Sequence, residues 1–213
     1  MQKKALIITG HYGSGKTNIA VNLALDYAAA GERVCIIDLD IVNPYFRTAD
    51  FGELFEEKGI RMIAPQYANT NLDIPSLGFD MAALLREYDR VIIDVGGDDA
   101  GAIALGQYAT ILQNFGYEML YVVNSFRYLT GTPDEAVELL RDIELVSRLK
   151  ATGIVNSSNL GAETTAEDVL GSVEYAERAA ETAGLPLVFT VAERRLGLTQ
   201  FRGVEVYVRP FWE

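Results

Sequence analysis

The sequence is poor in cysteine and in long apolar runs, and each shortage excludes a class of protein. A single cysteine, Cys35, in 213 residues rules out a disulfide framework and a cysteine cluster for zinc or an iron–sulfur centre. Cys35 lies in an apolar, strand-like run, so we expect it in the core. No apolar run reaches the roughly 18 residues that a membrane-spanning helix needs.

Positive charge is also scarce. The chain has 18 Lys and Arg residues against 30 Asp and Glu residues, a net charge of −12. Such an excess repels nucleic acid and anionic lipid surfaces unless a local basic patch overrides it. The densest basic spots, Lys3-Lys4 and Arg194-Arg195 with Arg202, resemble an ordinary protein surface. The charge distribution therefore disfavours nucleic acid and membrane as partners.

The length and composition favour one compact unit. With 49% apolar residues the chain is long enough to bury one substantial core, and no linker, repeat or low-complexity tract divides it. The segment Met1-Gln2-Lys3-Lys4 leads into a strand-like run instead of the apolar region of a signal peptide. We therefore expect a single domain over residues 1–213 and a cytoplasmic location.

Short β-branched runs alternate with longer segments of helical period. Continuous apolar strands of this kind are typical of a parallel sheet covered on both faces. The alternation predicts an α/β fold, a three-layer, doubly wound, mostly parallel sheet. The expected strands are Ala5–Thr9, Val34–Asp38, Val91–Val95, Met119–Val123, Gly153–Asn156 and Leu187–Val191, with an edge strand at Val204–Val208.

Capping signals mark where the intervening helices begin. Thr132, Pro133 and Glu135 have the pattern of an N-cap, a first-turn proline and a capping-box glutamate. We expect the same chemistry to open a helix at Thr164-Thr165-Ala166-Glu167. Further helices are predicted over Asn18–Ala30, ended by Gly31, and over Phe79–Glu87, with a surface loop over Pro65–Gly78.

The strongest motif is the run Gly10-His11-Tyr12-Gly13-Ser14-Gly15-Lys16-Thr17, which satisfies G-x-x-x-x-G-K-[ST] between a predicted strand and a predicted helix. Its glycines let backbone N–H groups turn toward an anion, and the N-terminus of the following helix at Asn18 adds its positive dipole end. We expect Lys16 to reach the β- and γ-phosphates and Thr17 to give its hydroxyl to Mg²⁺. Residues 10–18 thus form the predicted nucleotide-binding loop.

Acidic residues follow at the ends of the next strands. Asp38 and Asp40 end the second predicted strand, and Asp94 ends the next strong one. The carboxyl ends of strands line the ligand crevice of an open α/β sheet, so all three can reach the phosphates. We expect Asp94 to hold Mg²⁺ through its water shell. Gly97, in Asp94-x-x-Gly97, has the spacing of a switch that binds the γ-phosphate. A lone strand-end aspartate is often only a helix cap or turn former, but three behind a complete P-loop favour the site.

With these motifs in place, the chain resembles the MinD/ParA branch of P-loop ATPases, the CobQ/CobB/MinD/ParA nucleotide-binding domain with a deviant Walker A motif (SIMIBI class). The resemblance rests on the early P-loop, on the Ile37-Asp38-Leu39-Asp40 strand and on the later D-x-x-G. It implies slow Mg²⁺-dependent ATP hydrolysis, with Asp38 supporting the Mg²⁺ shell, Asp40 orienting the attacking water in switch I, and Gly97 marking switch II. Asn156 matches the base-contacting asparagine of the branch, although a plain turn former is the alternative.

Three features depart from the branch. His11 stands where the branch has a lysine that crosses an ATP-sandwich dimer to the partner's phosphates, so a nucleotide-dependent homodimer should be weaker here. His11 is then either a pH-sensitive donor or an ordinary loop residue. No Cys-x-x-Cys is present, which argues against the iron–sulfur carriers of the branch. The tail Tyr207–Glu213 lacks the basic amphipathic helix that anchors MinD to membrane.

Two other functions remain open. The same P-loop fits a small-molecule kinase or an ATP-dependent ligase, in which Asp40 and Arg47 would bind the acceptor and Arg194-Arg195 would belong to a lid. A regulatory module would instead bind an unknown protein partner through the switch I segment Asn43–Arg47, which carries two aromatic residues and an arginine. These aromatic residues fit packing under the loop equally well. The absence of Asn-Lys-x-Asp favours ATP over GTP.

Overall fold

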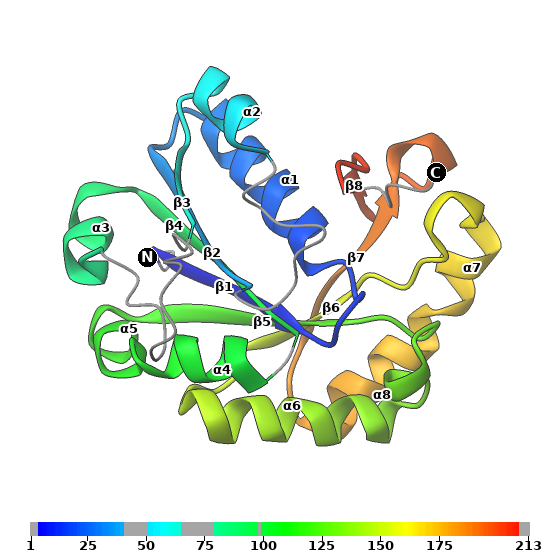
Figure 1. The fold of residues 1–213 in the computed structure, drawn as a ribbon. Coiled ribbons are helices and arrows are strands. Elements are labelled where there is room, and N and C mark those ends of the chain that lie inside the picture. The colour runs from blue at the N-terminus through cyan, green and yellow to red at the C-terminus, as the bar shows by residue number, and fades with distance from the viewer. Residues whose placement is uncertain (1–3, 41–50, 65–78, 98, 209–213) are drawn as a thin grey trace, which may run out of the picture.

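The computed structural model describes residues 4–40, 51–64, 79–97 and 99–208 (Figure 1). Its centre is one eight-stranded sheet in the order β3-β2-β4-β1-β5-β6-β7-β8, and every pair of neighbouring strands is parallel. The strands are β1 (Ala5–Gly10), β2 (Val34–Leu39), β3 (Arg61–Ile63), β4 (Arg90–Val95), β5 (Tyr117–Val123), β6 (Gly153–Asn156), β7 (Leu187–Glu193) and β8 (Arg202–Val204).

Helices cover both faces of the sheet, which makes three layers (Figure 1). One face carries α1 (Lys16–Ala29) and α2 (Gly52–Glu57). The other carries α3 (Met81–Glu87), α4 (Asp99–Gly106), α5 (Ala109–Phe115), α6 (Pro133–Ser147) and α8 (Val173–Ala183), and α7 (Ala166–Gly171) precedes α8. No helix in the described ranges is long and apolar enough to cross a membrane. The predicted fold class is confirmed.

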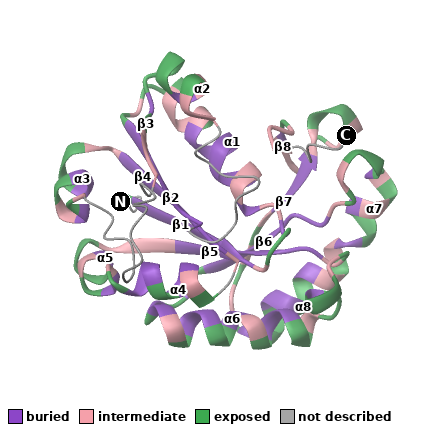
Figure 2. Ribbon diagram, viewed as in Figure 1, coloured by how far each residue is buried: buried purple, intermediate pink, exposed green. Residues whose placement is uncertain are grey.

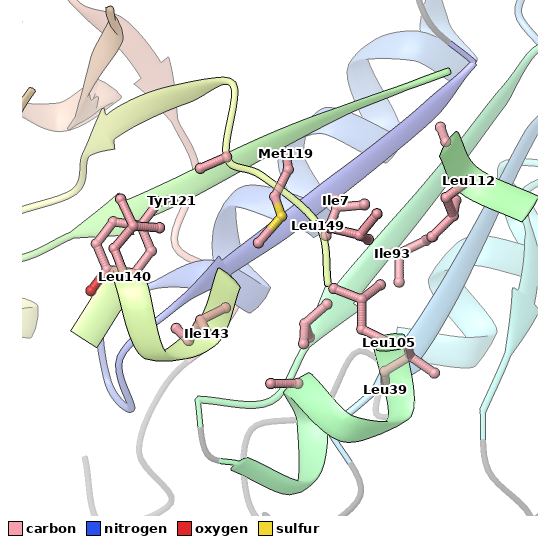
Figure 3. Packing of buried hydrophobic residues seen from close by; sticks show 14 of the residues in the cluster. Ile7, Leu39, Ile93, Leu105, Leu112, Met119, Tyr121, Leu140, Ile143 and Leu149 are labelled. Atoms are coloured by element: carbon pink, nitrogen blue, oxygen red, sulfur yellow. The ribbon is translucent and has the colours of Figure 1, made fainter. Parts of the chain in front are cut away.

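Each central strand is buried on both faces because its alternate side chains enter two separate cores (Figure 2). In β1, Ile7 joins the core beneath α4 and α6, whereas Ile8 joins the core beneath α1. Figure 3 shows Ile7 and Ile93 packed together with Leu105 of α4. This two-sided burial is why the strands read as continuous apolar runs and not as alternating ones.

The six expected strands are present, and each observed strand contains the predicted residues. Two predictions need correction, one for the cap of a helix and one for the edge strand. The capping box of α7 is formed by Thr165 and Asp168, one residue later than Thr164 and Glu167, because the Thr164 hydroxyl is bonded to Gly161 O and Leu160 N. The edge strand β8 ends at Val204, where the chain turns to α1 instead of continuing along β7. The predicted loop Pro65–Gly78 lies entirely outside the described residues.

The winding of the sheet reverses at β1, the strand that leads into the P-loop. β1 lies between β4 and β5, and its connection to β2 runs through α1 on one face of the sheet. The connection from β4 to β5 runs through α4 and α5 on the opposite face. Ligands of doubly wound folds bind outside the carboxyl ends of the strands where the winding reverses. The loop from β1 to α1 lies at this point.

Candidate functional site

The β1–α1 loop is held in a strained, closely packed form that glycine alone allows. Gly13 and Gly15 have φ values of 71° and 93°, in the left-handed region that side chains disfavour. A Cβ atom on Gly10 would lie 2.4 Å from Val122 O in β5, and one on Gly15 would lie 2.7 Å from Ser157 Oγ. The loop therefore packs closely against the sheet on one side and against the segment after β6 on the other.

Lys16 is folded back over this loop. Its side chain is buried, and its Nζ donates a hydrogen bond to His11 O at 3.0 Å. The first turn of α1 has no side-chain cap and no acidic residue, so its N–H groups and its positive dipole end are directed at the loop. Both features suit a phosphate group.

Two buried polar atoms of the loop point to the same ligand chemistry. His11 Nδ1 and Ser14 Oγ are buried with no hydrogen-bond partner among the described residues. Buried polar atoms in folded proteins are almost always paired, so an unpaired one marks a position where a ligand or water completes the site. The loop thus fits the phosphates of a nucleotide on its geometry as well as on its sequence.

Three carboxylates lie at the carboxyl ends of β2 and β4, and β4 adjoins β1, the strand that leads into the loop. Asp38 and Asp94 are directly opposite each other in the paired strands β2 and β4, and both are fully buried. Asp40 lies one residue beyond β2, and its backbone N–H donates to Asp38 Oδ1 at 2.9 Å. Asp94 pairs with Ile8 of β1, two residues before Gly10. Within the described ranges no three His, Cys, Asp or Glu side chains form a group that could hold a metal ion by themselves.

Gly97 touches the loop through its backbone. A Cβ atom at Gly97 would lie 2.5 Å from Tyr12 N and 2.9 Å from His11 C. The segment after β4 therefore presses directly on the loop after β1, and a glycine is needed for that approach. The structure thus brings Asp94-x-x-Gly97 and the P-loop into contact. Asp98, the next residue, lies outside the described residues.

Two predicted nucleotide contacts use their side chains elsewhere. Asn156 is fully buried at the end of β6, where its Nδ2 donates to Ser172 Oγ at 2.9 Å and its Oδ1 accepts from Ser158 N at 3.1 Å. This geometry favours the structural alternative for Asn156. The Asn18 side chain bonds the backbone of Glu205 and Tyr207, so it is engaged with the segment after β8.

His11 has the electrostatics of a neutral loop residue. Burial lowers the pKa of His11 below its usual 6.5, and the positive charges of Lys16 and Arg127 lower it further. An imidazole with a lowered pKa is uncharged near neutral pH. In the nucleotide-free protein His11 therefore carries no charge comparable to that of the family's second lysine.

Sequence reasoning missed Arg127. It lies in the loop after β5, and its Nε donates to Gly13 O at 2.8 Å. No motif surrounds it, so only the path of the chain could reveal the contact.

The switch I segment Asn43–Arg47 lies outside the described residues. Arg195 bonds Ala162 O and Thr164 O, and Arg194 pairs with Glu205, so both are tied to their own surface.

Comparisons with known proteins agree with this geometry. The family model described as the CobQ/CobB/MinD/ParA nucleotide-binding domain matches residues 6–191. A search of curated proteins gave no match. Among solved structures, FtsY from Mycoplasma mycoides has a TM-score of 0.60 at 20% identity, covering 90% of this chain and 60% of that one.

Two further structures share the fold. The cell division protein FtsY from Thermotoga maritima has a TM-score of 0.55 at 22% identity, covering 90% of this chain and 62% of its own. The 54 kDa signal recognition particle protein from Aeropyrum pernix K1, in complex with GDP, has a TM-score of 0.58 at 19% identity, covering 89% of this chain and 41% of its own. The chain thus spans about 40–60% of the length of these structures.

Proposed function

Because the chain belongs to the CobQ/CobB/MinD/ParA nucleotide-binding domain family, we propose that it binds Mg-ATP and hydrolyses it slowly as a nucleotide switch. Family membership makes it a nucleotide-binding P-loop domain. The proposal of ATP hydrolysis is carried by one observation: the P-loop, with Lys16 buried over it, lies beside the paired carboxylates Asp38 and Asp94.

In this proposal the backbone of residues 10–18 binds the phosphates. The N–H groups of the loop and of the first turn of α1 donate to phosphate oxygens, and Lys16 exchanges its bond to His11 O for the β- and γ-phosphates. The Ser14 hydroxyl gains a partner in the same step. Affinity therefore depends mainly on groups that the fold has already positioned.

In the proposal the three carboxylates bind Mg²⁺ and position the attacking water. Thr17, Asp38 and Asp94 hold Mg²⁺, the two aspartates through its water shell, which suits an ion that keeps several waters. Mg²⁺ neutralises charge on the phosphates when bound. Asp40 orients the attacking water, and its backbone bond to Asp38 keeps the two carboxylates in register. In phosphoryl transfer the protein contributes chiefly positioning and charge stabilisation.

The switch and its partner complete the proposal. Gly97 releases the γ-phosphate after hydrolysis, and its contact with Tyr12 and His11 passes that change to the P-loop. The segment Asn43–Arg47 follows Asp40 and binds an unknown protein partner. We place the protein in the cytoplasm. The lack of Asn-Lys-x-Asp supports ATP, although two similar structures were solved with GDP.

The binding step is tested by Lys16→Ala. We expect this variant to lose measurable affinity for Mg-ATP in calorimetry, because it removes the cation fixed over the loop. Lys58→Ala, an exposed residue just after α2, is the matched control and should bind normally. Wild-type affinity in Lys16→Ala, or a preference for GTP in the wild-type protein, contradicts the proposed site or its nucleotide.

The hydrolytic step is tested by Asp40→Ala. We expect near-normal Mg-ATP affinity and turnover at least about a hundredfold slower, as is typical for loss of a group that positions water or moves a proton. Asp142→Ala, on the exposed face of α6, is the control. Normal hydrolysis by Asp40→Ala would mean that a residue other than Asp40 orients the attacking water. Hydrolysis by the wild-type protein only when a small-molecule acceptor is added indicates a kinase or ligase instead.

A further inference from the structure

The loop after β5 directs an arginine at the P-loop. Arg127 Nε donates to Gly13 O at 2.8 Å, and a Cβ atom on Gly13 would lie only 3.3 Å from that nitrogen. Gly13 has a φ of 71°, so the same glycine provides both the loop conformation and the room for the guanidinium group. The contact joins segments 114 residues apart in the chain.

The loop that carries Arg127 is internally bonded. Asn124 Oδ1 accepts from Phe126 N at 3.0 Å, and Asn124 O accepts from Arg127 N at 3.2 Å. Thr130 Oγ1 donates to Asn124 O at 3.2 Å, and Tyr175 of α8 donates its hydroxyl hydrogen to Thr130 O at 2.5 Å. Arg127 is therefore presented by a supported turn, which limits the entropy lost when it binds a ligand.

The far end of the guanidinium group is available. Arg127 is half-buried, and its Nη atoms make no hydrogen bond or ion pair with any residue that the structure describes. Its charge reaches His11, as does that of Lys16, since both lower the His11 pKa. Two permanent cations thus lie around the loop of a chain whose net charge is −12.

We propose that Arg127 is a second phosphate-binding cation of the nucleotide site, held in place by the Gly13 carbonyl. The guanidinium group is a planar fork, so with Nε on Gly13 its two Nη groups remain to bind phosphate oxygens. Arg127 then supplies, in the same chain, a charge that does not depend on the protonation of His11. This inference rests on the proposed binding of a nucleoside triphosphate, and it assigns Arg127 to the β- and γ-phosphates.

The test compares ATP, ADP and AMP as ligands. We expect Arg127→Gln to weaken Mg-ATP binding about ten- to hundredfold, the range for a hydrogen bond to a charged group, and to change AMP binding by less than about threefold. Arg127→Met, which keeps the apolar stem, should behave the same if the glutamine variant folds poorly. Arg127→Lys, which keeps the charge but not the planar fork, should retain only part of the preference for ATP over AMP. Arg178→Gln, on the exposed face of α8, is the control.

Each outcome decides between specific alternatives. Equal losses for all three nucleotides mean that Arg127 only supports the loop, which overturns the inference. ATP affinity in both Arg127→Gln and Arg127→Met equal to that of Arg178→Gln overturns it as well. In either case a wild-type protein that binds Mg-ATP leaves the proposed function intact. A wild-type protein that binds no nucleotide removes the proposed function, and the inference with it.

Discussion

At Gly97 two motifs meet through backbone atoms, and this contact allows a sharp prediction. A methyl group there would lie 2.5 Å from Tyr12 N and 2.8 Å from Tyr12 Cα, and neither atom can move without shifting the P-loop. We expect Gly97→Ala to weaken Mg-nucleotide binding at least about tenfold, since loop geometry carries the affinity. Calorimetry measures the effect.

The control for this prediction is another glycine to which a methyl group can be added freely. A Cβ atom on Gly171, at the end of α7, would have no neighbour within 4 Å. Gly171→Ala should therefore leave nucleotide binding unchanged and raise the free energy of unfolding by roughly 0.4–1 kcal/mol. Wild-type nucleotide affinity in Gly97→Ala contradicts the proposed coupling between the two motifs.

His11 is the only histidine, so its titration can be followed without ambiguity. Its folded pKa lies below 6.5, because burial and then the charges of Lys16 and Arg127 disfavour the imidazolium. Between the folded pKa and 6.5 the unfolded chain binds more protons than the folded chain. The stability that His11 contributes is therefore fully present above about pH 6.5 and is lost as the pH falls through that window.

We expect the histidine signals in NMR to titrate below pH 6.5 in the nucleotide-free protein. Between about pH 7.5 and pH 5.5, the urea midpoint should fall more in the wild-type protein than in His11→Asn, which has no imidazole to titrate. Bound phosphates should raise the His11 pKa, because they favour the charged imidazole. A nucleotide-free pKa at or above 6.5 contradicts the described environment.

At the scale of elements, α1 holds the end of the chain much as a neighbouring strand would. Asn22 Oδ1 accepts from Glu205 N at 2.9 Å, and Asn22 Nδ2 donates to Glu205 O at 2.9 Å. One turn earlier, Asn18 Oδ1 accepts from Tyr207 N at 2.8 Å. The Tyr207 ring then meets Phe51 edge-on at 6.3 Å between centroids. This docking is why β8 ends at Val204.

We expect Asn22→Ala to release this segment. The variant leaves Glu205 N without its side-chain partner and leaves Glu205 O with Asn18 Nδ2 as its one remaining side-chain donor, so it should cost about 1–3 kcal/mol of unfolding free energy where the site stays dry. Amide exchange at Glu205 and Tyr207 should accelerate. Asn114→Ala, on the exposed side of α5, is the matched control and should change neither. Unchanged exchange at Glu205 in Asn22→Ala contradicts the role of the asparagine pair.

At the scale of the whole molecule, the P-loop face displays aromatic side chains. Tyr12 of the loop is 52% exposed, and Tyr128, one residue after Arg127, is 94% exposed. Exposed aromatic residues beside a charged site are typical interface anchors. We expect a weak homodimer that forms through this face with Mg-ATP and not with ADP, weak because a neutral His11 replaces the bridging lysine of the family.

Sedimentation velocity with each nucleotide checks this expectation. Tyr128→Ser should shift the ATP-bound protein toward monomer, whereas Leu145→Ser, which removes a 78% exposed leucine from α6, should not. The same sedimentation profile with ATP, ADP and no nucleotide contradicts the dimer. A profile altered only by Leu145→Ser moves the interface to the α6 face.

Much of the fold followed from the sequence because its signals are local. Strands buried on both faces, such as those at Ile7 and Ile93, read as continuous apolar runs. The three-residue strand β3 is too short for any period to be read, and its hydrogen bonds to β2 alone make it a strand. Helices α2 and α5 are as short as α3 and α7 but have no side-chain N-cap, so neither length nor a capping signal distinguished them from loop.

The conformation of the P-loop was determined by the sequence itself, because its glycines, Lys16 and Thr17 all lie in one short segment. Contacts between distant segments were decided only by the tertiary structure. Asn156 turns into the interior because Ser172 and Thr190 face it there, although its position matched a base-contacting residue. Arg127 reaches Gly13 because β5 adjoins β1 in the sheet. Local conformation depends on neighbouring residues in the chain, so it can be predicted from the sequence. The contacts of a side chain with distant residues depend on which strands pair, and only the tertiary structure shows that.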